Sequence, residues 1–175
     1  RAARQLREMG ILGEFRVSAE VETPYELCIS DASGGRTYLW RREPKVLATL
    51  QTADLSPICG AQAVYADWYD GDHTLPALRE ATRLKVPVFF NFEHGHGDPE
   101  LVARYAPFIS TCQAVTDAAQ RRYNALEVAV KLRDAGVDTA LVTMAERGCL
   151  AATEDTCIRV LAPRVKVIDA CASGA

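Results

Sequence analysis

The chain has 175 residues, 49% of them hydrophobic and 25% charged, which suits one globular domain with a single core. Its formal net charge of −3 gives no basic surface of the kind that binds nucleic acid or an anionic membrane. No apolar run approaches the roughly 20 residues of a membrane-spanning helix, and the polar start does not resemble a signal peptide. We therefore expect a cytoplasmic protein with no nucleic-acid or membrane partner.

Two further features bear on the context of the protein. The sequence does not begin with Met, so we expect it to start inside a longer protein. A chain of this length does not need disulfide bonds and contains no CxxC pair, so we interpret its six cysteines as buried thiols in a reducing compartment. The cysteines are Cys28, Cys59, Cys112, Cys149, Cys157 and Cys171.

The first part of the chain combines a helix with a hairpin. Leu6, Met9 and Leu12 recur at helical spacing, which predicts a helix at the start of the chain. The stretch TPYELCISDASGGRTYLW, residues 23–40, predicts two strands joined by a tight turn at Ser33-Gly34-Gly35.

From residue 61 onward, strand-like runs alternate with helix-like runs. Helices are expected at 74–85, 98–106 and 121–136, with Thr74 and Asp98 as caps. The near-continuous apolar run VPVFFNFE is typical of a parallel sheet that is covered on both faces. The expected strands are 61–69, 86–93, 108–115, 138–144 and 164–169, with a hairpin over 148–163.

This alternation predicts an α/β fold, with a mostly parallel sheet, right-handed crossovers and helices on both faces, in a single domain over 1–175. Ligands of such sheets bind beyond the carboxyl ends of the strands, so a site is expected in the loops that follow them. Those loops come after Ala66, Phe92, Val115, Thr143 and Ile168.

Two of these loops are rich in small residues. In VTMAERG, residues 142–148, Gly148 can let the backbone approach a nucleotide and Thr143 offers a hydroxyl to phosphate. In isolation, however, this segment favours plain turn chemistry. The end of the chain, DACASGA, can form an anion-binding nest of backbone amides or a small-residue turn against tight packing.

Two other loops carry polar side chains. FEHGHGD brings Glu93, His94, His96 and Asp98 to a strand end. Imidazole and carboxylate groups are good metal ligands, but His-Gly-His is not a recognised ligand spacing, so we favour a polar loop that touches substrate. The three carboxylates of DWYDGD, residues 67–72, are interpreted as helix caps rather than as an acid/base pair.

Four segments stand in an informative order: the hairpin ending in Gly35-Arg36-Thr37, then AVYADWYDGD, ALVTMAERGCLAAT and APRVKVIDACASGA. This order resembles the ribokinase-like (PfkB) carbohydrate kinases, nearest to their ketohexokinase-like branch. The four segments are similar to the family's lid, the strand after the lid, the nucleotide segment Val-Thr-Leu-Gly-Glu-x-Gly, and the motif Asp-Thr-Thr-Gly-Ala-Gly-Asp. The resemblance spans essentially all 175 residues.

The resemblance implies a three-layer fold with a β-lid at about 20–42, and ATP-dependent phosphorylation of a hydroxyl on a sugar or sugar-like molecule. It implies that Arg36, on the lid, reaches substrate or phosphate. It also implies that ATP, accompanied by Mg²⁺, lies along a short segment of the chain. The residues of that segment are Thr143, Ala145, Glu146 and Gly148, with Ala145 where the family usually has Gly.

The same resemblance assigns roles to the end of the chain. The backbone amides of Ala172, Ser173 and Gly174 fall around the charge that develops on the transferred phosphoryl group. Asp169 and the carbonyl of Cys171 fall where many family members bind a monovalent cation such as K⁺.

The sequence departs from the family at the catalytic base. Aligned directly, the family's catalytic Asp falls on Ala175, which cannot accept a proton. Either this position is truly Ala, or the register slips by two residues and a Gly-Asp follows Ala175. The family's Asn-Glu motif, which is associated with Mg²⁺, is also missing, and Gln113 and Thr116 stand nearby instead.

These departures leave more than one function open. An active kinase is expected if the Asp follows, although the 175 residues alone then have no meaningful turnover. A non-catalytic sugar- or nucleotide-binding pseudokinase is the main alternative, and a generic α/β domain with an unrelated ligand is a third. The apolar side chains of the hairpin predict a homodimer formed through the lid. These side chains are Leu27, Ile29, Tyr38 and Trp40.

Overall fold

The computed structural model describes residues 2–11, 13, 17–31, 36–116 and 124–166. The chain forms two compact units, Arg1–Val46 and Leu47–Ala175. The organisation of both units into a single domain stays a prediction.

The first unit contains the predicted helix and hairpin. Helix α1 (Ala2–Glu8) precedes the antiparallel strands β1 (Tyr25–Ser30) and β2 (Arg36–Arg41), and α2 (Pro44–Ala48) follows them. In the register of the hairpin Leu27 pairs with Leu39, and Cys28 pairs with Tyr38. Side chains directly opposite each other share a face of the sheet, so Leu27 and Tyr38 lie on opposite faces.

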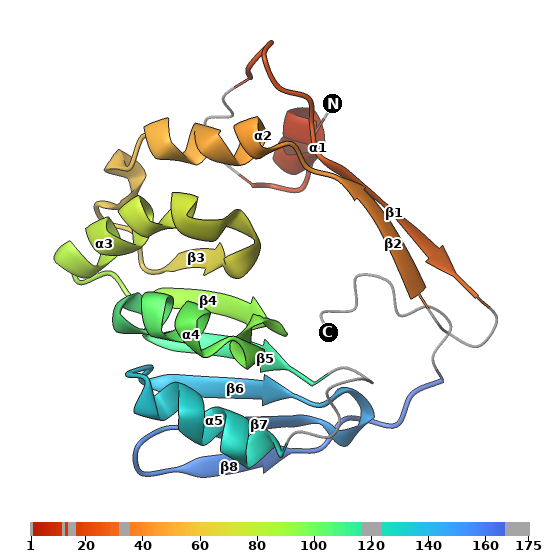
Figure 1. Cartoon of the computed structure of the whole chain (residues 1–175), viewed down its shortest axis with the longest axis vertical. Coiled ribbons are helices and arrows are strands. Elements are labelled where there is room, and N and C mark those ends of the chain that lie inside the picture. The colour runs from red at the N-terminus through yellow and green to blue at the C-terminus, as the bar shows by residue number, and fades with distance from the viewer. Residues whose placement is uncertain (1, 12, 14–16, 32–35, 117–123, 167–175) are drawn as a thin grey trace. The chain divides into compact units, whose positions relative to one another are not determined.

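The second unit is built on a six-stranded sheet in the order β3-β4-β5-β6-β7-β8. Neighbouring strands from β3 to β6 are parallel, and β7 and β8 complete the sheet as an antiparallel hairpin. The predicted mostly parallel α/β sheet and the hairpin near residue 150 are therefore confirmed (Figure 1). The strands are β3 (Val64–Asp67), β4 (Val88–Glu93), β5 (Thr111–Val115), β6 (Thr139–Thr143), β7 (Cys149–Ala152) and β8 (Cys157–Val160).

Three α-helices connect the parallel strands, and their ends follow local chemistry. Asp98 caps α4 (Pro99–Tyr105) as predicted, since its side chain accepts hydrogen bonds from the backbone N–H groups of Glu100 and Leu101. Helix α5 (Ala125–Asp134) begins later than expected, because the side chain of Asn124 accepts from Leu126 N. Thr74 precedes α3 (Leu75–Arg83) but makes no capping bond with its side chain.

Short 3-10 helices fill most of the remaining connections. They are η1 (Thr49–Thr52), η2 (Ser56–Ile58), η3 (Trp68–Thr74), η4 (Gly95–Gly97), η5 (Ala106–Phe108) and η6 (Ala145–Arg147). Three of them, η3, η4 and η6, directly follow parallel strands or lie one residue beyond them.

The core lies between the sheet and the helices. The chain steps from β3 to β6 in one direction across the sheet, and right-handed crossovers in one direction place α3, α4 and α5 on the same face (Figure 1). Along β4, buried and half-buried side chains alternate strictly, as expected when one face is covered more deeply. The buried rings of Phe90, Phe92 and Tyr105 pack against one another with centroids 4.8 and 4.9 Å apart.

Two predictions from the sequence are wrong. Residues 164–166 do not form the expected last strand, and the remainder of that stretch, 167–169, lies outside the described residues. Of the five cysteines that the structure describes, only Cys112 is buried, whereas Cys59 and Cys157 are exposed, so the prediction of buried thiols fails for most of them. Cys157 is exposed because β8 is the edge strand of the sheet and all its residues are exposed.

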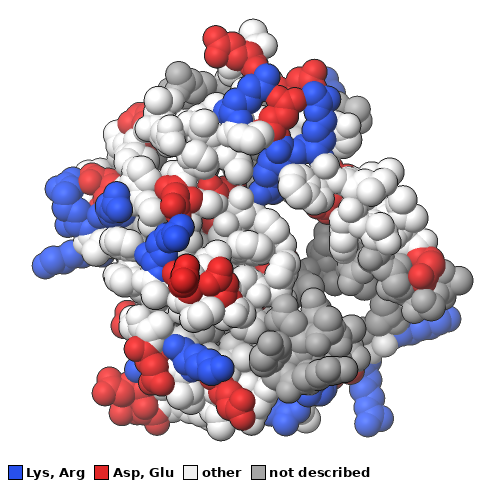
Figure 2. Space-filling view, in the orientation of Figure 1, with Lys and Arg blue, Asp and Glu red and all other residues white. Residues whose placement is uncertain are grey.

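The surface agrees with the modest net charge. Figure 2 shows Lys and Arg side chains interspersed with Asp and Glu across the visible face. Within the described ranges, no helix is both long enough and apolar enough to cross a membrane.

Candidate functional site at the carboxyl edge of the parallel sheet

The four parallel strands end side by side, so the loops that follow them lie along one edge of the sheet. Strands β3, β4, β5 and β6 end at Asp67, Glu93, Val115 and Thr143. In an open α/β sheet this edge is where ligands bind.

At the ends of β3 and β4, four side chains form what we call the rim cluster: Trp68, Tyr69, Glu93 and His94. The hydroxyl of Tyr69 donates a hydrogen bond to Oε2 of Glu93, and Nδ1 of His94 lies 3.8 Å from the same oxygen. The Tyr69 and Trp68 rings have centroids 4.6 Å apart, and His94 meets Trp68 edge-on at 5.1 Å. The rim cluster therefore joins a carboxylate to three rings from two neighbouring loops.

The backbone around Glu93 is irregular. Glu93 has a φ of 46°, in the left-handed region that non-glycine residues seldom adopt, and the β4–β5 register shifts between Asn91 and Glu93. The Glu93 N–H donates to Oδ1 of Asn91 at 3.0 Å. A Cβ at Gly95 would come within 2.9 Å of the Trp68 ring, so this loop packs tightly onto the indole. Such irregularities are common where a strand re-aims a side chain beside a functional site.

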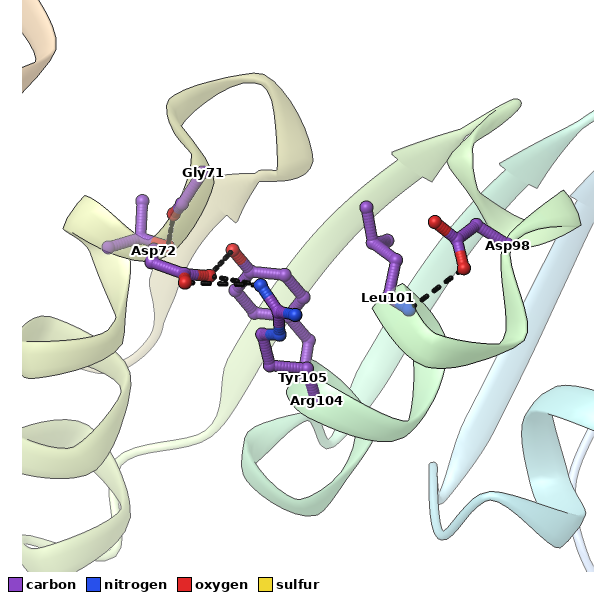
Figure 3. A network of polar contacts seen from close by, with 7 residues as sticks. Gly71, Asp72, Asp98, Leu101, Arg104 and Tyr105 are labelled. Atoms are coloured by element: carbon purple, nitrogen blue, oxygen red, sulfur yellow. Dashed lines mark hydrogen bonds and ion pairs between the residues drawn. The ribbon is translucent and has the colours of Figure 1, made fainter.

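The acidic residues next to the rim cluster act mainly in local structure. Oδ1 of Asp67 accepts from the Tyr69 N–H at 2.9 Å, which confirms the interpretation of this carboxylate as a cap. Asp72 accepts from Arg104 and from the hydroxyl of Tyr105 (Figure 3). Hydrogen bonding from Arg104 lowers the pKa of Asp72, whereas burial and the Asp72 charge raise the pKa of Tyr105 to about 12.

The suggested metal ligands have other partners. Asp98 caps α4, and Nε2 of His96 lies 3.1 Å from the carbonyl oxygen of Val115. Within the described ranges, no group of three or more His, Cys, Asp or Glu residues is placed to hold a metal ion. The loop is polar and lies at the carboxyl edge, as expected for the alternative that we favoured.

The ends of β5 and β6 are tied together by two threonines. The backbone N–H and the hydroxyl of buried Thr116 both donate to the carbonyl oxygen of Thr143, at 2.9 and 3.1 Å. The Thr143 hydroxyl donates to Ala114 O at 3.4 Å, a long bond that is easily exchanged for another acceptor.

The turn after β6 is shaped by its backbone. Met144 N–H donates to Gly148 O, and Gly148 N–H donates to Ala145 O, which closes the turn. Ala145 has a φ of 50° and Gly148 a φ of 90°. A Cβ at Gly148 would lie 1.9 Å from Val160 O, so Gly148 is required by the close approach of the chain's own backbone.

The structure brings some predicted site residues together and does not reach others. The four residues assigned to ATP, Thr143, Ala145, Glu146 and Gly148, lie in this one turn at the carboxyl edge. Arg36 is the first residue of β2, in the other unit. The remaining candidates lie outside the described residues: Asp169, Cys171, Ala172, Ser173, Gly174 and Ala175.

Sequence reasoning missed the rim cluster as a unit. Tyr69 and Glu93 are 24 residues apart, and only the parallel pairing of β3 with β4 brings them together. An available signal was that Glu93 ends one parallel strand and Tyr69 follows the end of the preceding one, and the carboxyl ends of such strands meet at one edge.

No protein-family model matches the sequence, and a search of the curated proteins finds no significant match. Comparison with solved structures identifies the fold as ribokinase-like, which confirms the predicted resemblance at the level of the fold.

The similar solved structures include ribokinase from Thermotoga maritima, with a TM-score of 0.73, 17% identity, and coverage of 96% of this chain and 57% of that one. The Burkholderia thailandensis nucleoside kinase in complex with inosine has a TM-score of 0.75 and 14% identity, and the match covers 96% of this chain and 56% of that one. Aminoimidazole riboside kinase from Salmonella enterica, complexed with aminoimidazole riboside and an ATP analog, has a TM-score of 0.51 and 24% identity, and the match covers 61% of this chain and 41% of that one. The chain thus spans less than two thirds of each of these proteins.

Proposed function

We propose that this chain is part of an ATP-dependent kinase that phosphorylates a hydroxyl of a sugar or sugar-like small molecule. The observation that carries the proposal is the turn after β6, which has the predicted nucleotide segment at the carboxyl edge of a sheet whose fold matches solved kinases. Ala145, Glu146 and Arg147 are exposed in this turn, so a nucleotide has access to it.

The proposed roles follow the resemblance. ATP would supply the phosphoryl group, and Mg²⁺ would neutralise part of the negative charge on its phosphates. Thr143 offers its hydroxyl to a phosphate oxygen, exchanging the long bond to Ala114 O, and Ala145, Glu146 and Gly148 lie along the nucleotide. The amides of 172–174 stabilise the transferred group, Asp169 and the Cys171 carbonyl hold a monovalent cation, and Arg36 reaches substrate or phosphate.

Kinetics on the full-length protein test the proposal. ADP release is measured with ATP–Mg²⁺ and a panel of sugars, and at least one sugar should be turned over. Thr143→Val keeps the side-chain volume but removes the hydroxyl, so it should raise the KM for ATP about tenfold, the value of one hydrogen bond to a charged group. Thr139→Val, at the opposite end of the same strand, should leave this KM unchanged.

The competing function is a pseudokinase that binds but does not transfer. It is favoured if ATP–Mg²⁺ or a sugar raises the melting temperature of the full-length protein while no ADP is released. The codons after Ala175 also discriminate, because an immediate Gly-Asp supplies the acceptor of the hydroxyl proton, whereas a stretch without Asp favours the pseudokinase.

We also propose that the protein forms a homodimer through the β1–β2 hairpin. Apolar side chains are exposed on both faces of this hairpin, including Leu27 at 55% and Trp40 at 67%. Sedimentation of the full-length protein should give a dimer, and a monomer at every concentration contradicts this proposal.

A further inference from the structure

We propose that β8 is an interface through which two copies of this protein pair edge to edge about a two-fold axis. Among the described residues, β8 is the last strand of its sheet, and all of its residues are exposed. An exposed strand edge carries backbone groups that pair readily with another strand. The interface belongs to the unit Leu47–Ala175, whereas the β1–β2 hairpin belongs to the other unit, so the two dimer contacts are separate.

The hydrogen bonds of the β7–β8 hairpin identify which backbone groups point outward. The N–H of Thr153 donates to the carbonyl oxygen of Thr156 at 2.8 Å, so these two residues form a hydrogen-bonded pair of the antiparallel ladder. Such pairs alternate with non-hydrogen-bonded pairs, so Ile158 directs its N–H and C=O groups toward β7. The N–H and C=O groups of Cys157 and Arg159 therefore point to the open edge of the sheet.

Two-fold symmetry restricts the register. Residues directly opposite each other share a face of the sheet, so a strand that pairs with its own copy has one residue on the axis. The two central residues of β8, Ile158 and Arg159, are the candidates, because either keeps most of the strand paired. With Arg159 on the axis, two like charges face each other, which is destabilising. With Ile158 on the axis, Cys157 lies opposite Arg159 of the second copy, and the two such pairs make four backbone hydrogen bonds.

The charges of the hairpin are complementary in this register. Glu154 and Asp155 form an acidic turn before β8, and Figure 2 shows acidic side chains gathered at this end of the hairpin. Asp155 is two residues from Cys157, so it lies diagonally across from Arg159 of the second copy, and the axis makes this contact twice. The guanidinium of Arg159 lies 3.4 Å from the carbonyl oxygen of Arg147, a long bond that is easily exchanged for one to a carboxylate.

A groove beside the acidic turn adds apolar area to the interface. It has a volume of about 430 Å³ and lies between α5 and the turn, with Leu126 and Val130 among its lining residues. Leu161 follows β8 and is 72% exposed. When the chain continues in the direction of the strand, Leu161 of the second copy lies opposite Asp155, at this groove. A specific interface buries about 1,000 Å² or more, so contacts of this kind must supplement the pairing of two short strands.

Sedimentation of the full-length protein tests the interface apart from the hairpin dimer. Ile29→Asp places a charge on β1 in the hairpin, and this variant should still sediment as a dimer. Adding Ile158→Asp should give a monomer, because two carboxylates then face each other on the axis. Adding Tyr65→Asp instead changes an exposed apolar residue on β3, at the opposite edge of the sheet, and should leave the dimer intact. A monomer in Ile29→Asp alone, or a dimer that survives Ile158→Asp, overturns the proposal.

Charge reversal tests the complementarity. Asp155→Arg and Arg159→Asp should each weaken the dimer about tenfold, because each places like charges across the interface. The variant with both changes restores the opposite charges and should regain most of the lost affinity. A double variant as weak as the single ones overturns the proposed register.

A disulfide reads the register directly. Ile158→Cys places two thiols opposite each other at a non-hydrogen-bonded position, where Cα atoms are about 4.5 Å apart, within the range for a disulfide. Diamide, which takes up the two thiol hydrogens, should then give a covalent dimer on a non-reducing gel. Val160→Cys changes a residue opposite Thr156 of the second copy, so it should give no more covalent dimer than the wild-type protein, whose Cys157 lies opposite Arg159. Equal cross-linking of the two variants, or none in either, overturns the pairing.

Discussion

The two ends of the carboxyl edge are built differently. At β3 and β4, side chains from separate loops hold one another, with Tyr69 bonded to Glu93 and the Trp68 ring packed over Gly95. At β6 and β7, the backbone itself makes the contacts, and Gly148 lies against Val160 O. This difference predicts how each end responds to substitution. At β3 and β4 a neighbouring side chain can shift to make room for an added atom, whereas at Gly148 the neighbouring backbone cannot.

The largest effect is expected at the backbone-built end. Gly148→Ala places a Cβ 1.9 Å from Val160 O in a residue with a φ of 90°. We expect a loss of about 3–4 kcal/mol in the free energy of unfolding, measured by urea denaturation. Gly97→Ala is the control, because nothing lies within 4 Å of its added Cβ. Equal stability of the two variants would remove the distinction between the ends.

The second prediction concerns the hydrogen bond from Tyr105 to Asp72, a side-chain contact made by the segment that follows β3. The pKa of Tyr105 is raised to about 12, so the folded protein keeps the neutral phenol at a pH where the unfolded chain ionises. Because the unfolded chain alone ionises between these two pKa values, the free energy of unfolding is highest below pH 10. It should fall by about 2 kcal/mol as the pH rises from 10 to 12. The free energy of unfolding is measured by urea denaturation at pH 9 and pH 12. Its decrease between the two pH values should be about 2 kcal/mol smaller in Tyr105→Phe than in the wild-type protein, and unchanged in Tyr65→Phe.

Gly95→Ala probes the same end through packing. The added Cβ would lie 2.9 Å from the Trp68 ring, but this side chain is able to shift, unlike a backbone oxygen. We therefore expect a smaller loss of about 1–2 kcal/mol in the free energy of unfolding. A loss as large as that of Gly148→Ala contradicts the idea that side chains give way at this end.

The smallest effect is expected at the cap beyond the rim cluster. Asp98→Ala removes the acceptor for two N–H groups at the start of α4, at a cost of about 1 kcal/mol in thermal or urea unfolding. Asp134→Ala changes an exposed carboxylate in the last turn of α5 and serves as control. If Asp134→Ala lowers the free energy of unfolding as much as Asp98→Ala does, the effect of Asp98→Ala does not come from the loss of a helix cap.

Much of the fold followed from local pattern. The period of apolar residues gave β4, α3 and β6, and Asp98 marked the start of α4, because capping and periodicity act over a few neighbouring residues. The start of α5 was placed too early, since the capping role of Asn124 was not recognised in a polar stretch. The exposure of Cys157 was also missed, because it depends on β8 being an edge strand.

The sequence by itself determined the alternation of strands and helices, and hence that polar loops follow the parallel strands at one edge. Only the tertiary structure decided which of those loops touch: Tyr69 meets Glu93 because β3 pairs with β4, and Gly148 is needed because β8 returns beside the turn. The physical reason is distance along the chain. Caps and periodicity are local interactions, whereas the contacts that shape the candidate site join residues 12 to 29 positions apart and exist only after the sheet has formed.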